Sequence, residues 1–385
     1  MNATRPIYLD YQASTPLCDY AYQAMIPFMR DQWANPHSSQ HIDGINSMLK
    51  IEESRQRLAN FIGSDSNEII FTSGATEANN LALQGFRNTK SKRNKILVSA
   101  IEHKAVLAPA EYLSTNGFEL EIIPVNGEGI VDVDAYRAMI SGDVLLVSIM
   151  AANNEIGSIQ PIELLARIAK DHGAFFHTDA AQIPVHMRID VEELGVDLLS
   201  LSSHKMYGPK GIGLLYVSNL VKNEIIPIIF GGGQEQDLRS GTLPTALCIG
   251  FASAAVHLLD NQSEIRENIR RLRDYFWNKL RLTSNGIKLI GPSLEERHIA
   301  NLCVSFEGID ADELLGILQT NVSASTGSAC SSQTIQSSHV LRAMKMEPDI
   351  IDGSIRFSFG IPLTEGDLNE AISYISGALE TCRQQ

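Results

Sequence analysis

The sequence contains Val144-Leu-Leu-Val-Ser-Ile-Met150, then Ile162-Glu-Leu-Leu-Ala-Arg-Ile-Ala-Lys-Asp171, then Ala174-Phe-Phe-His-Thr178. The first and third runs are short and largely apolar, which is typical of strands whose sheet is covered by helices on both faces. The middle run has the pattern of an amphipathic helix. This order of strand, helix and strand predicts a parallel βαβ unit.

The same alternation continues along the first part of the chain. It predicts an α/β fold with a large, mostly parallel sheet of seven strands flanked by helices. The other expected strands are Glu68–Thr72, Lys95–Ser99, Leu120–Val125, Leu198–Ser200 and Gly213–Tyr216, and the other expected helices are Ala75–Gln84, Ala105–Thr115 and Val133–Met139.

A change of character after Gly241 predicts a second, smaller α/β unit. We expect one long charged helix from about Thr245 to Leu282, followed by strands near Asn301–Phe306 and Ser354–Phe359. Because long helices commonly bridge two domains, we place the boundary inside this helix. The prediction is a large domain of residues 13–260 and a small domain of residues 1–12 and 261–385.

Composition excludes several classes of protein. The 385 residues carry a formal net charge of −14, which argues against direct binding of nucleic acid. The five cysteines form no Cys-x-x-Cys pair, which favours a reducing, cytoplasmic compartment over a disulfide framework or a metal site. The first ten residues contain no apolar run, and no stretch of 18 apolar residues occurs, so we expect neither a signal peptide nor a membrane span.

Ser202-Ser203-His204-Lys205 follows a predicted strand and precedes Gly208-Pro-Lys-Gly211. A lysine in a pocket can hold an aldehyde cofactor as a Schiff base. Taken alone, the motif is more often a surface lysine in a polar loop.

Two further motifs follow predicted strands. Asp179, in His177-Thr-Asp-Ala-Ala-Gln182, stands at the end of a parallel strand, where α/β folds bind ligands. Its carboxylate could pair with a cofactor ring nitrogen or equally cap a helix. The motif Phe71-Thr-Ser-Gly-Ala-Thr-Glu77 begins a helix, where backbone N–H groups form a phosphate cradle, although plain helix capping explains it as well.

Cys330 lies in Ser325-Thr-Gly-Ser-Ala-Cys-Ser-Ser332, within a polar stretch that predicts a mobile loop. A thiol among small polar residues differs from a buried structural cysteine and can serve as a nucleophile. An incidental free thiol is the alternative interpretation.

Together with Glu102-His103-Lys104, Asn153-Asn-Glu-Ile-Gly157 and Arg239-Ser-Gly-Thr242, these motifs resemble those of the cysteine desulfurases in the class V aminotransferase family. The resemblance covers nearly the whole chain, from Tyr8-Leu9-Asp10 to Ser354-Ile-Arg-Phe-Ser358. Each motif alone has a structural explanation, such as a helix cap or an incidental thiol. Four independent motifs in the order and spacing of one family favour the functional interpretation of all four. The resemblance implies the aspartate-aminotransferase-like fold, which is fold type I of the enzymes that use pyridoxal phosphate (PLP).

The resemblance implies a homodimer that binds pyridoxal 5′-phosphate and takes sulfur from L-cysteine, leaving a persulfide on Cys330 and releasing L-alanine. Lys205 would hold the cofactor, and His103 would stack on its ring and take part in proton transfer. The remaining cofactor-binding residues would be Ala75, Thr76, Asp179, Gln182, Ser202, His204 and, from the opposing subunit, Thr242. The substrate carboxylate would be held by Asn154 and Arg356, with help from Asn35.

The resemblance leaves the sulfur acceptor open between iron–sulfur cluster assembly and the thio-modification of tRNA or DNA. The nearest rivals are an aminotransferase or a selenocysteine lyase of the same fold. Cys330 argues against an aminotransferase, which needs no thiol nucleophile. A non-catalytic protein of this fold would be expected to lack Lys205 or Asp179, and both are present.

Overall fold

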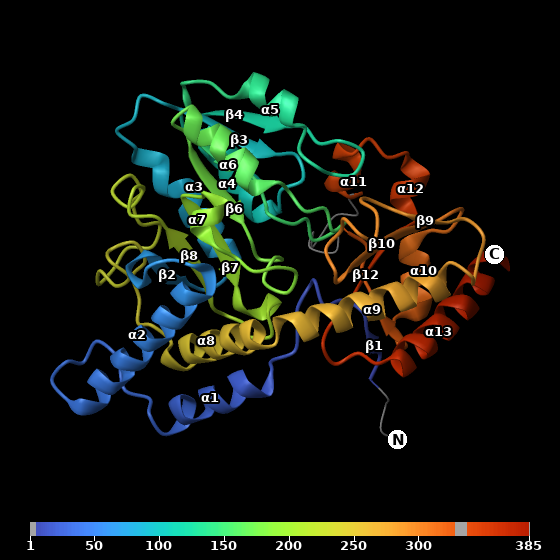
Figure 1. Ribbon diagram of the computed structural model, residues 1–385, viewed down its shortest axis with the longest axis horizontal. Helices are drawn as coiled ribbons and strands as arrows, with labels where there is room; N and C mark the ends of the chain where they lie inside the picture. The colour runs from blue at the N-terminus through green and yellow to red at the C-terminus, as the bar shows by residue number, and fades with distance from the viewer. Residues whose placement is uncertain (1–4, 328–336, 385) are drawn as a thin grey trace.

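The computed structural model describes residues 5–327 and 337–384 (Figure 1). Its centre is a seven-stranded sheet in the order β2-β8-β7-β6-β5-β3-β4. β8 is antiparallel to both of its neighbours, and the other pairs are parallel, so the predicted sheet is confirmed. The strands are β2 (Ile69–Thr72), β3 (Lys95–Ser99), β4 (Glu119–Ile123), β5 (Val144–Ser148), β6 (Phe175–Asp179), β7 (Leu198–Ser202) and β8 (Gly213–Val217).

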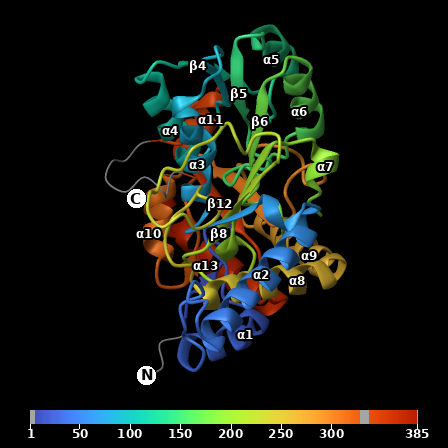
Figure 2. The same ribbon diagram turned by 90° about the vertical axis from the view of Figure 1, so that its left-hand side faces the viewer.

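Helices cover both faces of this sheet. On β3, Leu97 belongs to one buried cluster while Ile96 and Val98 belong to the other, because successive side chains of a strand point to opposite faces. Figure 2 shows α1, α2 and α8 grouped in its lower part and α5 and α6 in its upper part. The helical segments before the last third are α1 (Asp19–Arg30), α2 (Ile42–Ile62), η1 (Ser66–Glu68), α3 (Ala75–Gln84), η2 (Gly85–Asn88), α4 (Lys104–Ser114), α5 (Val133–Met139), α6 (Ile162–Asp171), α7 (Val191–Leu194) and η3 (Ser203–Lys205).

The prediction of one long charged helix after Gly241 is wrong. The segment forms α8 (Thr245–Asp260) and α9 (Gln262–Leu280), which meet at Asn261. Asn261 has φ −113° and ψ 13°, and its side-chain amide donates to the His257 carbonyl at 2.8 Å. A short polar side chain that binds the preceding turn competes with the helical hydrogen bonds, which accounts for the break. α8 is largely buried and apolar, and apart from Asp260 the acidic residues, Lys and Arg belong to α9.

The rest of the chain forms a second α/β layer beside α9 (Figure 1). Its antiparallel sheet has the order β12-β10-β9, and the two strands expected from the sequence, β10 and β12, are confirmed. β1 lies parallel to β11, so Ile7 and Tyr8 pair with Val322 and Ser323 in the last third of the chain. The division into two domains near residue 260 remains a prediction. The elements are β1 (Ile7–Tyr8), β9 (Ile287–Leu289), β10 (Asn301–Phe306), α10 (Ala311–Leu318), β11 (Val322–Ser323), α11 (His339–Ala343), α12 (Pro348–Asp352), β12 (Ser354–Ser358) and α13 (Glu365–Gln384).

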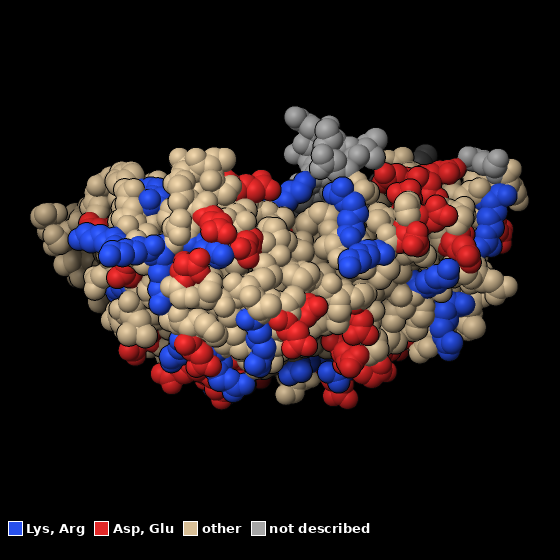
Figure 3. Space-filling model, turned by 90° about the horizontal axis from the view of Figure 1, so that it is seen from above, with Lys and Arg blue, Asp and Glu red and all other residues tan. Residues whose placement is uncertain are grey.

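The surface carries charges of both signs. Acidic and basic side chains are interspersed over the face seen in Figure 3. In the part of the chain that the structure describes, no helix combines the length and the apolar character needed to cross a bilayer.

Candidate active site

The carboxyl ends of β2, β6 and β7 lie at one edge of the large sheet. β8 is antiparallel to β2 and to β7, so these two strands run in the same direction, as does β6. Thr72 and Ser202, which end β2 and β7, both pair with Gly213 at the start of β8. A Cβ atom on Gly213 would lie 2.7 Å from the Cα of Gly74, so glycine is what lets the turn after β2 approach β7.

A cavity of about 430 Å³ opens at this edge of the sheet. It brings together ten of the residues predicted from the sequence: Ala75, Thr76, His103, Asn154, Asp179, Gln182, Ser202, His204, Lys205 and Arg356. Two other predicted residues, Asn35 and Thr242, are exposed and do not line it. Cys330 lies outside the described residues.

One end of the cavity is rich in hydrogen-bond donors. α3 begins there with Ala75 and Thr76, and its cap residue, Gly74, has no side chain to satisfy the first N–H groups of the helix. His204 contributes an imidazole, and burial, with the charges of Lys205 and Lys210, lowers its pKa to about 4. The ring is therefore neutral near pH 7 and can donate one N–H. Such a set can bind a phosphate group.

Asp179 presents a fixed carboxylate to the same cavity. Its two oxygens accept hydrogen bonds from the side-chain amide of Asn79 at 2.7 Å and from the backbone N–H of Ala181 at 3.0 Å. The alternative role as a helix cap is not realised, because the next helix, α7, begins only at Val191. Asn79 was not predicted, although it lies one turn after Ala75 and Thr76 on the same helix.

Lys205 ends η3, directly after β7. Its amine donates to the backbone carbonyls of Gln12 and Ala13, the latter at 2.8 Å. The carbonyl of Gln12 also accepts from the Gln182 side chain at 3.1 Å. Gln12 and Ala13 thus form part of the site. The hydrophobic periodicity of the sequence did not predict this.

Arg356, on β12, forms the opposite wall and is 4% exposed. Its terminal nitrogens donate to the Asn154 carbonyl at 2.9 Å, to Asp10 at 2.5 Å and to the Ser325 hydroxyl at 3.0 Å. Its Nε is buried and has no hydrogen-bond partner among the described residues. Asp10 was part of a recognised motif, but its pairing with Arg356 was not predicted.

His103 connects the two walls, since it lines the cavity as the cap residue of α4. Its Nδ1 accepts a hydrogen bond from the Ala105 N–H at 3.0 Å. In a neutral ring the proton therefore resides on Nε2.

The described site thus combines an amine, a carboxylate, the N-terminus of α3 and a buried arginine around one cavity. Residues 7–370 match the family described as Aminotransferase class-V. The chain therefore belongs to the class-V aminotransferase family.

The relatives narrow this assignment to one group of the family. Cysteine desulfurase IscS of Dictyoglomus turgidum is 43% identical over 382 residues, covering 98% of this chain and 96% of that protein. A solved NifS-like protein has a TM-score of 0.91 at 36% identity, covering 98% of this chain and 100% of that one. The solved structure of SspA in complex with cysteine has a TM-score of 0.79 at 34% identity, covering 93% and 99%. This chain thus belongs with the cysteine desulfurases, and the predicted family and fold class are confirmed.

Proposed function

We propose that this chain is a pyridoxal-phosphate-dependent cysteine desulfurase, which moves the sulfur of L-cysteine to Cys330 and releases L-alanine. The observation that carries the proposal is the meeting of Lys205, Asp179 and Arg356 at one cavity. The chain's likeness to cysteine desulfurases over 98% of its length supports the same reaction.

Pyridoxal phosphate matches the donors and acceptors that line the cavity. The N-terminus of α3, the Ser202 hydroxyl and the neutral imidazole of His204 suit its phosphate. Asp179 suits the protonated ring nitrogen, and Gln182 suits the ring hydroxyl. When bound, the cofactor supplies an aldehyde for the Lys205 amine and a ring that withdraws electrons from the substrate.

The Nε of Arg356, which has no hydrogen-bond partner in the described part of the chain, fits the substrate carboxylate. A guanidinium presents parallel N–H groups that match the two oxygens of a carboxylate, and burial strengthens the contact. Asn154, whose carbonyl already accepts from Arg356, lies on the same wall. These residues orient L-cysteine so that its Cα proton faces the amine of Lys205, which acts as the general base, while His103 assists further proton transfer.

The net reaction balances with Cys330 as the acceptor of sulfur. The Cβ–S bond of L-cysteine breaks, an S–S bond forms on Cys330, and a proton ends on Cβ to give L-alanine. Cys330 must react as its thiolate, because the thiolate is the nucleophilic form. The persulfide then passes to a protein acceptor, and iron–sulfur assembly and the thio-modification of tRNA or DNA are the candidate pathways.

The test measures L-alanine and sulfide released from L-cysteine in the presence of a reductant, for the wild type and for Cys330→Ser. We expect equal amounts of both products from the wild type and neither from the variant. Pyruvate in place of alanine would indicate a lyase. Unchanged activity in Cys330→Ser would remove the proposed role of this thiol.

We also propose a homodimer whose partner subunit supplies Thr242. α1, α2 and the segment between them expose large apolar side chains, including Trp33, which is 79% exposed. Phe230 is 74% exposed. The segment that carries it is tied to α2, because Glu235, five residues later, forms a buried ion pair with Arg55 of α2 at 2.6 Å. An exposed apolar surface of this kind marks an interaction site.

Sedimentation measurements with and without pyridoxal phosphate test the dimer. Trp33→Asp should shift the protein toward monomer and weaken cofactor binding, because Thr242 would no longer reach the opposing site. A monomeric wild type that binds the cofactor fully would contradict the shared site.

A further inference from the structure

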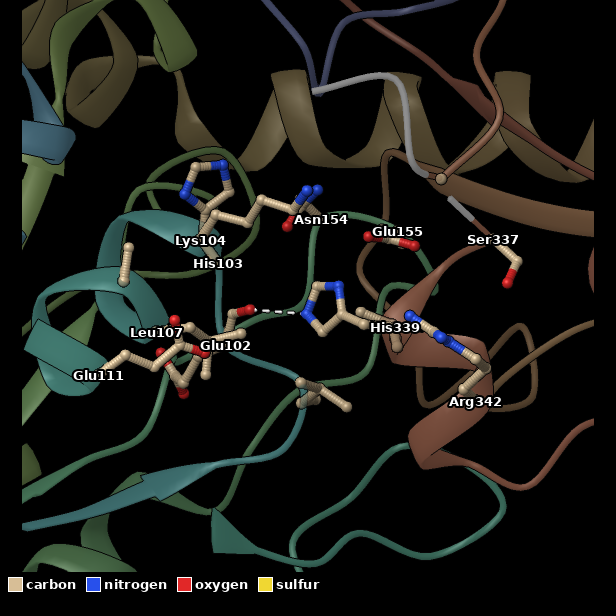
Figure 4. A pocket seen from close by; sticks show the side chains of 14 residues that line it. Glu102, His103, Lys104, Leu107, Glu111, Asn154, Glu155, Ser337, His339 and Arg342 are labelled. Carbon is tan, nitrogen blue, oxygen red and sulfur yellow. Dashed lines mark hydrogen bonds between the residues drawn. The ribbon is translucent and has the colours of Figure 1, made fainter. Parts of the chain in front are cut away.

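A second cavity, of about 260 Å³, lies next to the first and shares His103 and Asn154 with it (Figure 4). Its lining includes Gly327 and Ser337, which are the described residues on either side of the stretch that contains Cys330. The groups that hold these two ends therefore stand beside the proposed active site.

The carboxyl group of Glu155 contacts both ends. Glu155 is 6% exposed, and its Oε2 accepts a hydrogen bond from the Ser338 hydroxyl at 2.5 Å. The Ser338 oxygen in turn accepts from the N–H of Leu341 and caps α11. At the other end, a Cβ atom on Gly327 would lie only 2.2 Å from the same Oε2. Glu155 thus packs directly against Gly327.

A second contact holds the start of α11. The Nε2 of His339 donates to the backbone carbonyl of Glu102 at 2.9 Å, and Figure 4 shows this bond across the cavity. Glu102 directly precedes the proposed site residue His103, and Glu155 directly follows the proposed site residue Asn154. The start of α11 is therefore tied to both sides of the site.

The proposed reaction gives Glu155 no chemical step. A buried carboxyl group is costly unless it is hydrogen-bonded or paired. Burial raises the pKa of Glu155 to about 7, although the Ser338 hydroxyl and the charges of Arg356, His103 and Lys104 favour its ionised form. The free-energy cost of burying the Glu155 carboxyl group is therefore offset by its contacts, and these contacts indicate what the residue does.

We propose that Glu155 is a positioning residue for sulfur transfer, which fixes Gly327 and Ser338 beside Asn154 and Arg356. The inference rests on the proposed function, in which Cys330 receives the sulfur. Glu155 should then affect the transfer of sulfur without affecting the binding of L-cysteine. Binding of L-cysteine needs Arg356 and the cofactor site, whereas transfer of sulfur also needs the ends of the Cys330 segment to be held in place.

The first test compares Glu155→Ala, Ser338→Ala, the double variant and the control Ser337→Ala. Ser337 is the exposed neighbour of Ser338, so its change removes a hydroxyl without breaking the contact. The dissociation constant of L-cysteine comes from the absorbance change of the bound cofactor. Persulfide on Cys330 in a single turnover, trapped by alkylation and weighed by mass spectrometry, gives the transfer rate.

We expect Glu155→Ala and Ser338→Ala each to slow persulfide formation about tenfold, the loss from one hydrogen bond to a charged group. The double variant should be at most slightly slower than Glu155→Ala, because their shared hydrogen bond is already lost and only the Ser338 cap of α11 is removed in addition. Cysteine binding should change less than about twofold, and Ser337→Ala should match the wild type. Multiplied losses in the double variant, or equal losses in binding and transfer, would overturn the inference.

Gly327→Ala gives an independent test. In the wild type the added methyl group collides with the Glu155 carboxyl group, so persulfide formation should fall. In the Glu155→Ala background that carboxyl group is gone, and the same methyl group should cost little or nothing further. An equal loss in both backgrounds would show that Glu155 does not hold this end.

The pH profile separates positioning from bulk packing. The groups facing Glu155 are Arg356 of β12, His103 and Lys104 at the start of α4, Cys303 of β10 and Ser338. Glu155→Gln keeps the shape and an acceptor for Ser338 but cannot ionise, so it should rescue most of the rate that Glu155→Ala loses. We expect the wild-type transfer rate to change modestly near pH 7, where Glu155 ionises, and the rate of Glu155→Gln to show no such change. Failure of glutamine to rescue, or identical profiles, would contradict the positioning role.

The wild type checks the proposed function itself. If the wild type releases alanine but forms no persulfide on Cys330, the function assigned to Cys330 fails, and this inference fails with it. If the wild type forms the persulfide and the Glu155 variants do so at the wild-type rate, only the inference fails.

Discussion

The two walls of the main cavity are built in different ways. Asp179, Ser202 and Lys205 lie on or next to neighbouring strands, so the backbone pairing of β6 and β7 fixes their spacing. On the other wall, the backbone of Arg356 pairs with Cys303 of β10, but its guanidinium is placed by contacts to Asn154 and Asp10, which are 202 and 346 positions away in the chain. The groups of the first wall are fixed by the rigid large sheet, whereas the guanidinium on the second wall depends on a few long-range side-chain contacts. Changes on the two walls should therefore differ in kind.

The largest effect should come from Lys205→Ala on the sheet wall. Because Lys205 is proposed to hold the cofactor and to move the substrate proton, its loss should lower alanine formation by at least about 10²-fold, the usual range for a general base. The fold should remain, since the Lys205 amine donates to the backbone carbonyls of Gln12 and Ala13 and the strand before η3 is held by the sheet. Alanine assays and the absorbance spectrum of the bound cofactor measure the two effects.

Lys222→Ala is the matched control for this change. Lys222 donates to the Asn67 carbonyl and lies away from the cavity. It should keep wild-type activity. If Lys205→Ala kept an activity close to that of Lys222→Ala, the wall that contains Asp179, Ser202 and Lys205 would not carry the chemical step.

Arg356→Lys should have the next largest effect and should change binding. Lysine keeps the charge but loses the planar fork that contacts Asn154 and Asp10 and that is proposed to contact the substrate carboxylate. Losing a charged hydrogen bond of about 1.5 to 3 kcal/mol predicts a rise of roughly 10- to 100-fold in the KM for L-cysteine. Steady-state kinetics measure it.

The exposed Arg342 provides the control, as Arg342→Lys. It should leave KM unchanged. A fall in kcat with constant KM in Arg356→Lys would show that the second wall, too, acts in the chemical step.

The same contrast explains how much the sequence could predict. Each strand of the large sheet was predicted to within two residues at each end, because buried parallel strands are short apolar runs with clear helical segments between them. The residues of the sheet wall follow these strands directly. Their motifs therefore indicated both the chemistry and the position.

The second wall left weaker signals. Gln12 and Asp10 act through contacts with residues far along the chain, and a local pattern carries no information on such partners. The break at Asn261 depends on one side-chain hydrogen bond within an otherwise helical sequence. Arg356 was predicted only through resemblance to a family. Its neighbours in space became visible only in the structure.

Acidification should destabilise a buried pair of histidines, His186 and His298, whose Nδ1 atoms accept hydrogen bonds from the backbone N–H groups of Ile299 and Ala300. The His298 Nε2 donates to the carbonyl of Gln182 at 2.8 Å, and the ring of His186 lies 5.0 Å from that of His298. Burial lowers the pKa of both rings, that of His186 to about 4, with nearby arginines adding to the effect. Both rings are therefore neutral in the folded protein at pH 7.

The direction in which the folding stability changes with pH depends on which state binds more protons. Below pH 6.5 the unfolded chain binds protons that the folded chain does not, so stability falls as the pH drops from 6.5 toward 4. One such histidine costs about 2 kcal/mol at pH 5. Melting temperatures at pH 7.5 and pH 5 measure the loss, and His186→Asn should reduce it. An unchanged difference in the variant would show that this pair does not titrate on unfolding.

The smallest effect should come from Ser202→Ala, on the rigid wall. The phosphate is proposed to have several donors there, so removing one hydroxyl should cost about 1 kcal/mol, or roughly fivefold in cofactor affinity, with little change in kcat. Ser218→Ala is the control, because Ser218 follows β8 at the opposite edge of the sheet and its hydroxyl has no hydrogen-bond partner among the described residues. Cofactor titration followed by absorbance distinguishes the two variants. A loss of 100-fold or more in Ser202→Ala would mean that the sheet wall depends on single contacts as much as the opposite wall does.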